Sequence, residues 1–463
     1  MTKGILESIE MTDMADKGRA VGRTGDVVVF ASGAVPGDVI DAEVIKKFPT
    51  YIEAKALHIN TPSPFRTDPF CTHFGTCGGC KWQNLDYRAQ LTFKEKQVRD
   101  AMIRIAKLKD PEILPIIGSD RIQYYRNKLE FSFTNKRYLL KEEIDSGVEK
   151  IMDGLGFHIP GKFNKILDID TCYLQHDLSN RIRNFISTYA KSNAIPFFDI
   201  RKQTGMLRSL IIRNTEAGEW MVIVVFREEK SEVRVKLLDA VVKEFPELTS
   251  VMYIINTKKN DTVTDQAVHL HYGRSYLMEQ MEDLKFMIGP KSFFQTNTRQ
   301  AALLYKLTKE YAGLTGSELV YDLYTGTGTI AAFIAKHARN VIGVEYVAEA
   351  IEDAKQNAKI NGLENLEFFS GDLKDVLTTE FTAQHGHPDV VITDPPRAGM
   401  HEHVTKRLLE MAPEKIVYVS CNPGTQARDL LLLSEKYELV RMQPVDMFPH
   451  TSHVENVALL RLK

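Results

Sequence analysis

The sequence predicts an α/β protein whose C-terminal half is a doubly wound, Rossmann-like parallel sheet. From about residue 291 onward, strand-like and helix-like segments alternate, which is typical of such a sheet. Four of these strands run into glycine or an acidic residue, and ligands bind at the carboxyl edge of open parallel sheets. Short alternating strands at the start of the chain predict a separate small β-barrel, and a central α+β domain lies between the two.

The bulk composition is that of an ordinary globular protein. The 463 residues are enough for about two to four domains. The formal net charge is −2, so a polyanionic partner must be met by local basic patches. No apolar run is long enough for a membrane span, and the start at Met1 lacks the apolar stretch of a signal peptide, so we expect a cytoplasmic protein. The five cysteines are too few for a disulfide framework and indicate metal binding or catalysis.

Residues 1–60 are expected to form the small β-barrel. Alternating runs at 26–31 and 39–44 are separated by turn residues, including Gly33 and the Pro-Gly-Asp triplet at 36–38. This rhythm fits a five-stranded, OB-like barrel of the kind that binds oligonucleotides. A barrel that serves only as a spacer fits the same pattern.

A helix is expected over 87–107, after a Pro- and Gly-punctuated segment at 61–86. Its apolar side chains fall on one stripe at helical spacing, formed by Leu91, Val98, Met102 and Ile105. The rest of its surface is basic, and we expect it to face solvent; these residues are Arg88, Lys94, Lys96, Arg99 and Arg104.

The segment from 118 to 290 has the mixed pattern of an α+β domain. Strands are expected at 128–133 and 220–226, and a helix at 232–245. Residues 124–128 interleave tyrosines with basic residues, which indicates either RNA stacking and phosphate contact or an ordinary strand-edge cluster.

The C-terminal half carries the signature of a cofactor site. Strands expected at 318–323, 340–344, 366–370 and 390–393 are followed by Gly326 and Gly328, by Glu345, by Asp372 and by Asp394. Glycines let the backbone approach a ligand closely, and an acid after the second strand can hold ribose hydroxyls. The third glycine of the dinucleotide signature is missing, so the series matches an S-adenosylmethionine methyltransferase better than a nicotinamide enzyme.

Cys421 ends an apolar strand expected at 415–421 and is followed by an Asn-Pro-Gly-Thr turn. Its thiol therefore lies at the ligand-binding edge of the sheet. A cysteine there can act as a nucleophile on an electron-poor carbon. A half-buried structural cysteine is the alternative interpretation.

The other four cysteines form a trio and a distant single residue: Cys71, Cys77, Cys80 and Cys172. Four thiolates suit either tetrahedral zinc or an iron–sulfur cluster. Zinc ribbons pair two Cys-x-x-Cys knuckles, and only one is present here. Four unrelated buried thiols are a third possibility.

Three C-terminal motifs resemble those of the RNA uracil-5 methyltransferases, most closely the branch acting on 23S ribosomal RNA. They are Asp-Pro-Pro-Arg-Ala-Gly at 394–399, Ser-Cys-Asn-Pro-Gly-Thr at 420–425 and Asp-Met-Phe-Pro-His-Thr-Ser-His-Val-Glu at 446–455. The resemblance implies an N-terminal TRAM-like RNA-binding barrel, a central iron–sulfur and RNA-binding domain at 61–86 and 118–290, and a methyltransferase domain at 87–117 and 291–463. The early helix is then expected to pack on the catalytic domain.

The resemblance also implies roles for individual residues. Cys421 matches the family's nucleophile and Glu455 its general base. Positions that contact the cofactor, S-adenosylmethionine, are Gln295, Tyr324, Gly326, Gly328, Thr329, Glu345, Asp372 and Asp394; Thr329 stands where some members carry asparagine. The cysteine quartet is expected to bind a [4Fe–4S] cluster.

The chemistry explains why these groups are needed. Carbon 5 of uracil becomes nucleophilic only after a thiolate adds to carbon 6, and a base must later remove the proton from carbon 5. Arg397 is a candidate to stabilise the enolate oxygen. The target base must be unstacked, so we expect an RNA loop as substrate and a monomeric enzyme.

Three other functions fit parts of this sequence. Methylation of the tRNA T-loop uridine uses the same chemistry, but the barrel and the cysteine quartet argue against it. A nitrogen methyltransferase is suggested by the Asp-Pro-Pro motif at 394–396, although those enzymes usually carry an aromatic residue at the position of Arg397. An RNA-binding assembly factor with a relict cofactor fold does not explain why Cys421 and Glu455 are both present.

Overall fold

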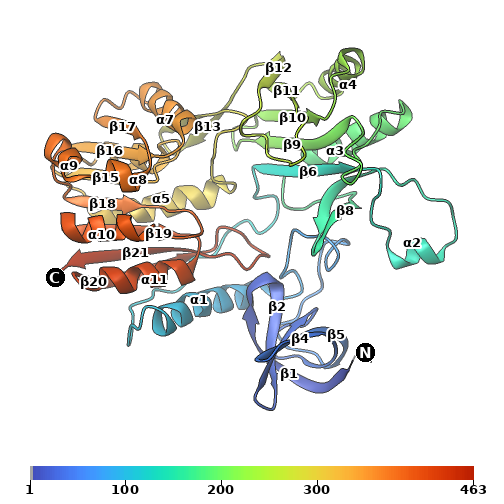
Figure 1. Ribbon diagram of the computed structural model, residues 1–463, viewed down its shortest axis with the longest axis horizontal. Coiled ribbons are helices and arrows are strands. Elements are labelled where there is room, and N and C mark those ends of the chain that lie inside the picture. The colour runs from blue at the N-terminus through green and yellow to red at the C-terminus, as the bar shows by residue number, and fades with distance from the viewer. Residues whose placement is uncertain (1–3) are drawn as a thin grey trace.

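The computed structural model describes residues 4–463; the first three residues of the expected barrel lie outside this range. The chain forms three bodies, an N-terminal barrel, a central sheet domain and a C-terminal sheet domain (Figure 1). The barrel closes in the order β1-β2-β3-β5-β4, with strands at Ile5–Ala15, Arg19–Thr24, Val27–Ser32, Val39–Lys47 and Tyr51–Thr61. The expected five-stranded barrel is confirmed. Its core also takes in Trp82, Leu85 and Ala89 from the following segment.

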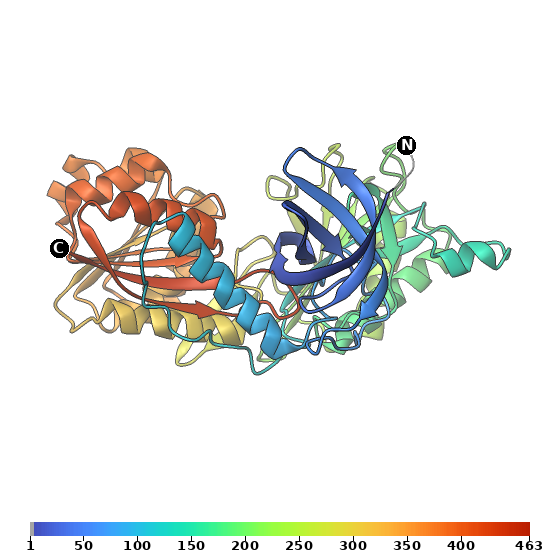
Figure 2. The same cartoon turned by 90° about the horizontal axis from the view of Figure 1, so that it is seen from below.

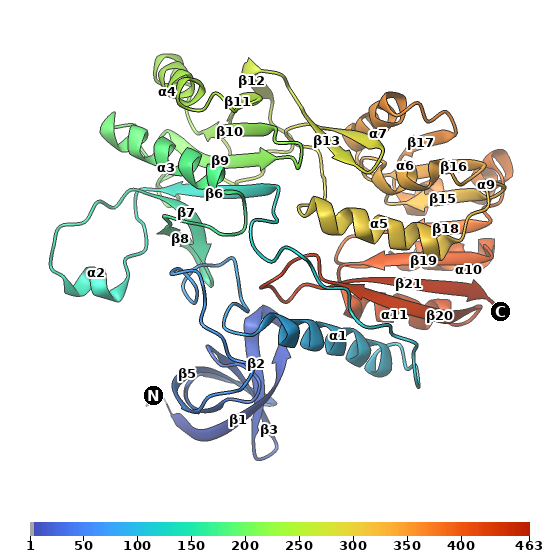
Figure 3. The same cartoon turned by 180° about the vertical axis from the view of Figure 1, so that it is seen from behind.

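Helix α1 (Tyr87–Arg104) leaves the barrel and packs against the C-terminal domain (Figures 2 and 3). The Asp86 carboxylate caps its first turn, which satisfies backbone N–H groups that have no helical partner. Val98 and Met102 are fully buried, whereas Ile105 is 41% exposed. The expectation that Lys94 faces solvent is wrong, because its side chain is fully buried.

The central domain is a seven-stranded sheet in the order β12-β11-β10-β9-β6-β7-β8. Its strands are β6 (Lys128–Thr134), β7 (Gly154–Ile159), β8 (Lys162–Asp168), β9 (Leu207–Asn214), β10 (Trp220–Phe226), β11 (Ser250–Ile255) and β12 (Val268–Gly273). Helices α3 (Asp177–Ser192) and α4 (Ser231–Glu244) bury their apolar sides against one sheet face. The short helix α2 (Lys141–Asp145) lies in the β6–β7 connection.

A two-stranded hairpin, β13 (Leu277–Met281) and β14 (Leu284–Ile288), joins the two larger domains. It precedes residue 291, where the C-terminal domain was expected to begin. Met281, Leu284 and Phe286 nevertheless pack in the core beneath the C-terminal sheet. The apolar core therefore groups this hairpin with the C-terminal domain.

The C-terminal sheet has the order β17-β16-β15-β18-β19-β21-β20. The first five are parallel, and β21 runs antiparallel between β19 and β20. The strands are β15 (Leu319–Leu323), β16 (Asn340–Glu345), β17 (Leu366–Ser370), β18 (Val390–Thr393), β19 (Lys415–Ser420), β20 (Tyr437–Val445) and β21 (Glu455–Leu462). The predicted doubly wound architecture is confirmed.

Helices cover both faces of this sheet (Figures 1 and 3). Helices α5 (Thr298–Ala312) and α6 (Thr329–Ala335) pack on one face, with α7 (Ala348–Ile360) beside β17. The other face packs against α1, α8 (Leu373–Val376), α10 (Glu402–Met411) and α11 (Pro423–Leu433); α9 (Thr379–His385) lies in the β17–β18 connection. Strand order reverses between β15 and β18, which is where such sheets form a ligand crevice. Across residues 4–463, no helix is both long and apolar enough to span a membrane.

Candidate active site

The turn after β15 is built from left-handed backbone. Tyr324, Gly326 and Gly328 have φ values of 62°, 56° and 74°, a conformation that glycine adopts readily and other residues adopt at a cost. Gly328 is also crowded, since a Cβ there would lie only 3.0 Å from the Ala354 Cβ. This turn leads into α6 and keeps backbone N–H groups at the edge of the crevice.

Acidic side chains from the next two strands lie at the same edge. Glu345 ends β16 and accepts hydrogen bonds from the Gly326 and Val347 N–H groups, at 3.2 and 2.9 Å. Asp372 caps α8 by accepting from the Lys374 N–H. The predicted ribose-binding acid is thus tied directly to the glycine turn.

Gln295 and Thr329 lie in different surroundings. The Asn127 side-chain amide of the central domain donates to the Gln295 carbonyl at 2.8 Å, so this cofactor-contact candidate lies where the two domains meet. Thr329 is buried, and its hydroxyl donates to the Tyr305 hydroxyl at 3.3 Å. The Thr329 hydroxyl therefore has one partner within the core, and its cofactor contact stays a prediction.

Sequence reasoning missed Asp322, which is 1% exposed near the end of β15. The Thr325 hydroxyl donates to its carboxylate at 2.5 Å. Burial raises the pKa of Asp322 to about 7. The acid lies inside the strand rather than after it, so the pattern of strand-end residues did not reveal it.

Cys421 and Glu455 are brought together by the sheet. Strand β19 pairs with β21 in an antiparallel register that ends with Ser420 opposite Asn456. The next position in this register sets Cys421 opposite Glu455, and directly opposed residues are close neighbours. Two groups that are 34 positions apart in the sequence are therefore adjacent at the carboxyl edge of the sheet.

Two loops are tied together around these groups. The Asn422 side-chain amide and the Thr425 hydroxyl both donate to the Arg397 carbonyl, at 3.0 and 3.2 Å. The Arg397 guanidinium lies 3.3 Å from the His453 ring. The loop that follows β18 is therefore held against Cys421 on one side and against the segment that leads to Glu455 on the other.

A second layer holds the same loop, and no sequence motif marked it. The buried Asp429 carboxylate on α11 accepts from the Met400 N–H at 2.9 Å and from the Tyr418 hydroxyl at 2.7 Å. Arg428 donates to the carbonyls of Ala398 and Met400. These bonds determine where the Asp-Pro-Pro-Arg loop meets the crevice.

The electrostatics of the site favour protonated acids and a protonated thiol. Burial, reinforced by the Asp394 carboxylate, raises the pKa of Glu455 to about 8. Burial and then the charges of Glu455 and Asp394 raise the pKa of Cys421 to about 11. Arg397 lowers both pKa values. A cation bound at this edge would offset the negative charge of the clustered carboxylates and lower their pKa values.

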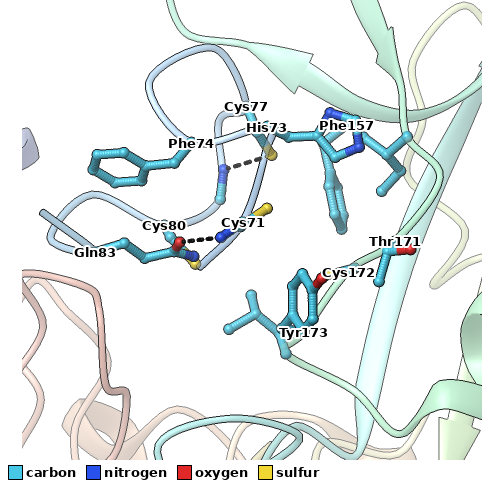
Figure 4. A pocket seen from close by; sticks show the side chains of 13 residues that line it. Cys71, His73, Phe74, Cys77, Cys80, Gln83, Phe157, Thr171, Cys172 and Tyr173 are labelled. Carbon is cyan, nitrogen blue, oxygen red and sulfur yellow. Dashed lines mark hydrogen bonds between the residues drawn. The ribbon is translucent and has the colours of Figure 1, made fainter. Parts of the chain in front are cut away.

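Cys71, Cys77, Cys80 and Cys172 line one pocket (Figure 4). The first three lie on a single loop, and Cys172 lies across the pocket on another segment. Burial raises the pKa of Cys77 to about 11 and that of Cys80 to about 12, and the neighbouring thiols add to both shifts. Within residues 4–463, no three His, Cys, Asp or Glu side chains are grouped closely enough to hold a single metal ion.

Comparisons with known proteins agree with this architecture. A family model described as tRNA (uracil-5-)-methyltransferase matches residues 247–463. An uncharacterized RNA methyltransferase of Porphyromonas gingivalis is 55% identical over 460 residues, covering 98% of this chain and 99% of the relative. Another from Bacteroides thetaiotaomicron is 54% identical, covering 97% of this chain and 100% of the relative.

A solved structure extends the likeness over the whole chain. The Pyrococcus abyssi tRNA (uracil-54, C5)-methyltransferase, in complex with S-adenosyl-L-homocysteine, is 30% identical with a TM-score of 0.75. The match covers 99% of this chain and 100% of that one. The likeness therefore includes the barrel and the central domain as well as the C-terminal sheet.

Proposed function

This chain belongs to the RNA uracil-5 methyltransferase family, and on that premise we propose that it methylates carbon 5 of a uridine in 23S ribosomal RNA. It is an S-adenosylmethionine-dependent RNA methyltransferase. The observation that supports the proposed chemistry is the β19–β21 register, which ends with Ser420 opposite Asn456 and, continued by one position, brings Cys421 beside Glu455; the Glu455 charge also raises the pKa of Cys421. A thiol and a base side by side are what addition to a pyrimidine and removal of its proton require.

The residues present fit the methyl donor. Gly326 leaves open space beside the backbone where a nucleoside could approach, because nothing lies within 4 Å of a Cβ there, and Glu345 accepts from its N–H. Gln295, Tyr324, Asp372 and Asp394 complete the proposed binding set, whereas Thr329 contributes through its position in α6 rather than through its hydroxyl. When bound, S-adenosylmethionine supplies an electrophilic methyl group attached to a positively charged sulfur.

In the proposed mechanism, the Cys421 thiolate adds to carbon 6 of the uracil, and a carbon–sulfur bond forms as the ring becomes an enolate. Arg397 is placed to stabilise the enolate oxygen. Carbon 5 then takes the methyl group, and the donor leaves as S-adenosylhomocysteine. Glu455 removes the proton from carbon 5, the bond between carbon 6 and Cys421 breaks, and the thiolate is released.

Substitution of the two reacting residues tests this mechanism. We expect Cys421→Ala to abolish methyl transfer and to form no covalent RNA complex, because no thiolate is left to add. Glu455→Gln should transfer a methyl group and then accumulate the covalent adduct, since proton removal is blocked. Gel mobility under denaturing conditions reports the adduct. A fully active Cys421→Ala enzyme would refute the mechanism.

We also propose that Cys71, Cys77, Cys80 and Cys172 bind a [4Fe–4S] cluster. The four thiols share one pocket, and four cysteine thiolates are the usual ligands of such a cluster. The reaction above needs no redox step, so the proposed job of the cluster is to fasten the 61–86 loop to the central domain.

Metal analysis of anaerobically purified protein tests the cluster. We expect iron and sulfide, and loss of both in Cys172→Ser together with a lower melting temperature. Cys421→Ser is the matched control and should keep its iron, because the fifth cysteine lies in a different domain. Stoichiometric zinc in place of iron would contradict the proposal.

The barrel at 1–60 and the central domain at 61–86 and 118–290 are proposed to bind the RNA around the target uridine, and the catalytic domain at 87–117 and 291–463 to carry out the chemistry. We expect a monomer in the cytoplasm that acts on an unstacked loop uridine. The buried Tyr125 is unavailable for base stacking, because its hydroxyl donates to the Pro449 carbonyl. Tyr124 remains partly exposed and is the better stacking candidate.

Methylation of a tRNA uridine is the second candidate, and one similar solved structure motivates it. The matching Pyrococcus abyssi protein is described as a tRNA enzyme and resembles this chain across the barrel, so the barrel does not argue against a tRNA substrate. Mapping 5-methyluridine in 23S and transfer RNA of a deletion strain separates the two. Loss from 23S RNA alone supports the proposal, and loss from transfer RNA alone overturns it.

A further inference from the structure

We propose that the buried Lys94–Asp446 ion pair positions Glu455 for removal of the proton from carbon 5. This inference rests on the proposed function and adds a positioning pair to it. Neither residue is in the set of reacting or cofactor-binding groups. They come from segments 352 positions apart, one in α1 and the other directly after β20.

The ion pair is completely enclosed. Lys94 Nζ donates to Asp446 Oδ1 at 2.6 Å, and both side chains are 0% exposed. The same ammonium group donates to the Phe448 carbonyl at 3.0 Å, and the Tyr87 hydroxyl donates to Asp446 Oδ2 at 2.9 Å. Buried charges are costly unless every partner is in place. These bonds therefore fix the position of Asp446 and Phe448 relative to α1.

Residues 446–453, here called the motif loop, are held from several other directions. The Gln90 side chain accepts from the His450 N–H at 2.9 Å and donates to the His450 ring at 3.1 Å. Backbone N–H groups of Lys81 and Trp82 donate to the His450 carbonyl. His450 itself has a left-handed backbone with φ of 64°, which a non-glycine residue keeps only when its surroundings demand it.

The catalytic domain holds the first residues of the same loop. Asn297 donates to the Met447 carbonyl, and Gln300 donates to the Asp446 carbonyl, each at 2.9 Å. Three parts of the chain therefore meet at this loop: the segment after the barrel, α1 and α5.

The motif loop connects β20 to β21, and Glu455 is the first residue of β21. Val445, the residue before Asp446, pairs directly with Glu455 across the two strands. At its other end, His453 lies beside Arg397, which lowers the pKa values of Cys421 and Glu455. A shift of Asp446 would therefore displace Val445, its neighbour in the chain, and through the Val445–Glu455 pair it would displace the proposed general base.

This arrangement predicts a defect in one step of the reaction. If the motif loop shifts, Glu455 moves relative to Cys421 and to the proton on carbon 5. Cys421 itself directly follows β19, and the turn after it is held by a different bond, from Asn422 to the Arg397 carbonyl. Addition and methyl transfer should therefore be less affected than elimination, and the covalent intermediate should accumulate.

The test measures how methylated RNA divides between free product and covalent adduct. Lys94→Met leaves a buried carboxylate unpaired and can fail to fold, so the double variant Lys94→Met/Asp446→Asn is made beside it. Its asparagine carries no buried charge and keeps one acceptor oxygen for the Phe448 N–H, which donates to Asp446 Oδ1 at 3.0 Å; the position that accepts from the Tyr87 hydroxyl becomes an amide N–H. In folded protein of either kind, we expect the adduct-to-product ratio to rise by about tenfold or more, because small misplacements of a catalytic group have effects of this size.

Lys96→Met is the matched control on the same helix. Lys96 is 42% exposed and pairs with Asp13 and Asp100, away from the motif loop. We expect its adduct-to-product ratio to equal that of the wild type. Binding of S-adenosylhomocysteine, measured by calorimetry, should be unchanged in all the folded variants.

Glu455→Gln is run in parallel to separate two failures. If Glu455→Gln forms no adduct, both the proposed mechanism and this inference are overturned. If Glu455→Gln accumulates adduct while the folded double variant has the same adduct-to-product ratio as the wild type, only the positioning role is overturned. The positioning role is also overturned if the variants have a lower melting temperature and if methyl transfer and elimination are slowed equally. In that case the Lys94–Asp446 pair only stabilises the fold.

Discussion

At the scale of single residues, Arg397 is the cation that acts on both proposed reacting groups. It lowers the pKa of Cys421 and that of Glu455, against burial and the Asp394 carboxylate, which raise both. Its backbone carbonyl accepts from Asn422 and Thr425, so the backbone from which the guanidinium extends is held in place. The thiolate needed for addition depends on this charge.

Replacement of Arg397 should make the Cys421 thiol harder to ionise. In Arg397→Met the positive charge is lost, so the pKa of Cys421 rises from about 11. The thiolate fraction at any pH below that value falls with it, as does the rate of alkylation by iodoacetamide. The measurement is the alkylation rate of Cys421 between about pH 8 and 11, followed by mass spectrometry of the peptide that contains Cys421, on protein that keeps its other cysteines.

Arg397→Lys is the control, because it keeps the charge without the planar guanidinium. We expect its alkylation profile to stay close to that of the wild type. A profile for Arg397→Met that moves to lower pH, or does not move, would contradict the assigned electrostatic role.

At the scale of elements, helix α1 shows how a periodic pattern can be correct and incomplete. Val98 and Met102 occupy the buried face, as their spacing predicted. Gln90 and Lys94 precede them at the same interval of four residues, which places all four on one side of a helix. Lys94 was predicted to face solvent because lysine is usually exposed, although its spacing placed it on the same side of the helix as Val98 and Met102.

The glycine turn before α6 gives a prediction at the same scale. Gly328→Ala should lower the melting temperature and weaken S-adenosylhomocysteine binding. Its left-handed backbone costs a non-glycine residue about 1–2 kcal/mol, and the new methyl group meets Ala354 and Phe368 at 3.0 Å. Thermal melting and calorimetry measure the two effects.

Gly362→Ala is the matched control for that variant. Gly362 has a similar φ of 62°, with nothing within 4 Å of a Cβ. Gly362→Ala should lower the melting temperature only through the cost of the left-handed backbone, and it should keep its affinity for S-adenosylhomocysteine. Equal behaviour of the two variants would show that crowding at Gly328 is unimportant.

At the scale of the whole molecule, polar contacts hold the domains in register around the active site. Asn127 in the central domain donates to the Gln295 carbonyl and to the Thr298 hydroxyl, at 2.8 and 2.9 Å. Arg213 of β9 donates to the Ser292 carbonyl at 2.7 Å. The segment that carries Gln295 is therefore placed by two domains together, so an RNA bound to the central domain has a defined position relative to the cofactor edge.

Much of the catalytic domain could be predicted from local patterns. Strands at 220–226, 366–370 and 390–393 were predicted with the bounds that the structure has, because apolar runs and turn residues are local signals. The antiparallel strands β20 and β21 were not predicted. Their pairing follows from which strand fits beside β19, and periodicity contains no information on that choice.

The sequence by itself determined the order of most elements of the catalytic domain, the glycine or acid at four strand ends, and the position of Cys421 directly after a strand. These follow from short-range steric and apolar preferences. Only the tertiary structure decided that β21 pairs with β19, which brings Glu455 near Cys421, that Asp322 is buried, and that Lys94 pairs with Asp446. Such contacts join distant segments, and they depend on how the sheet and helices pack rather than on any local pattern.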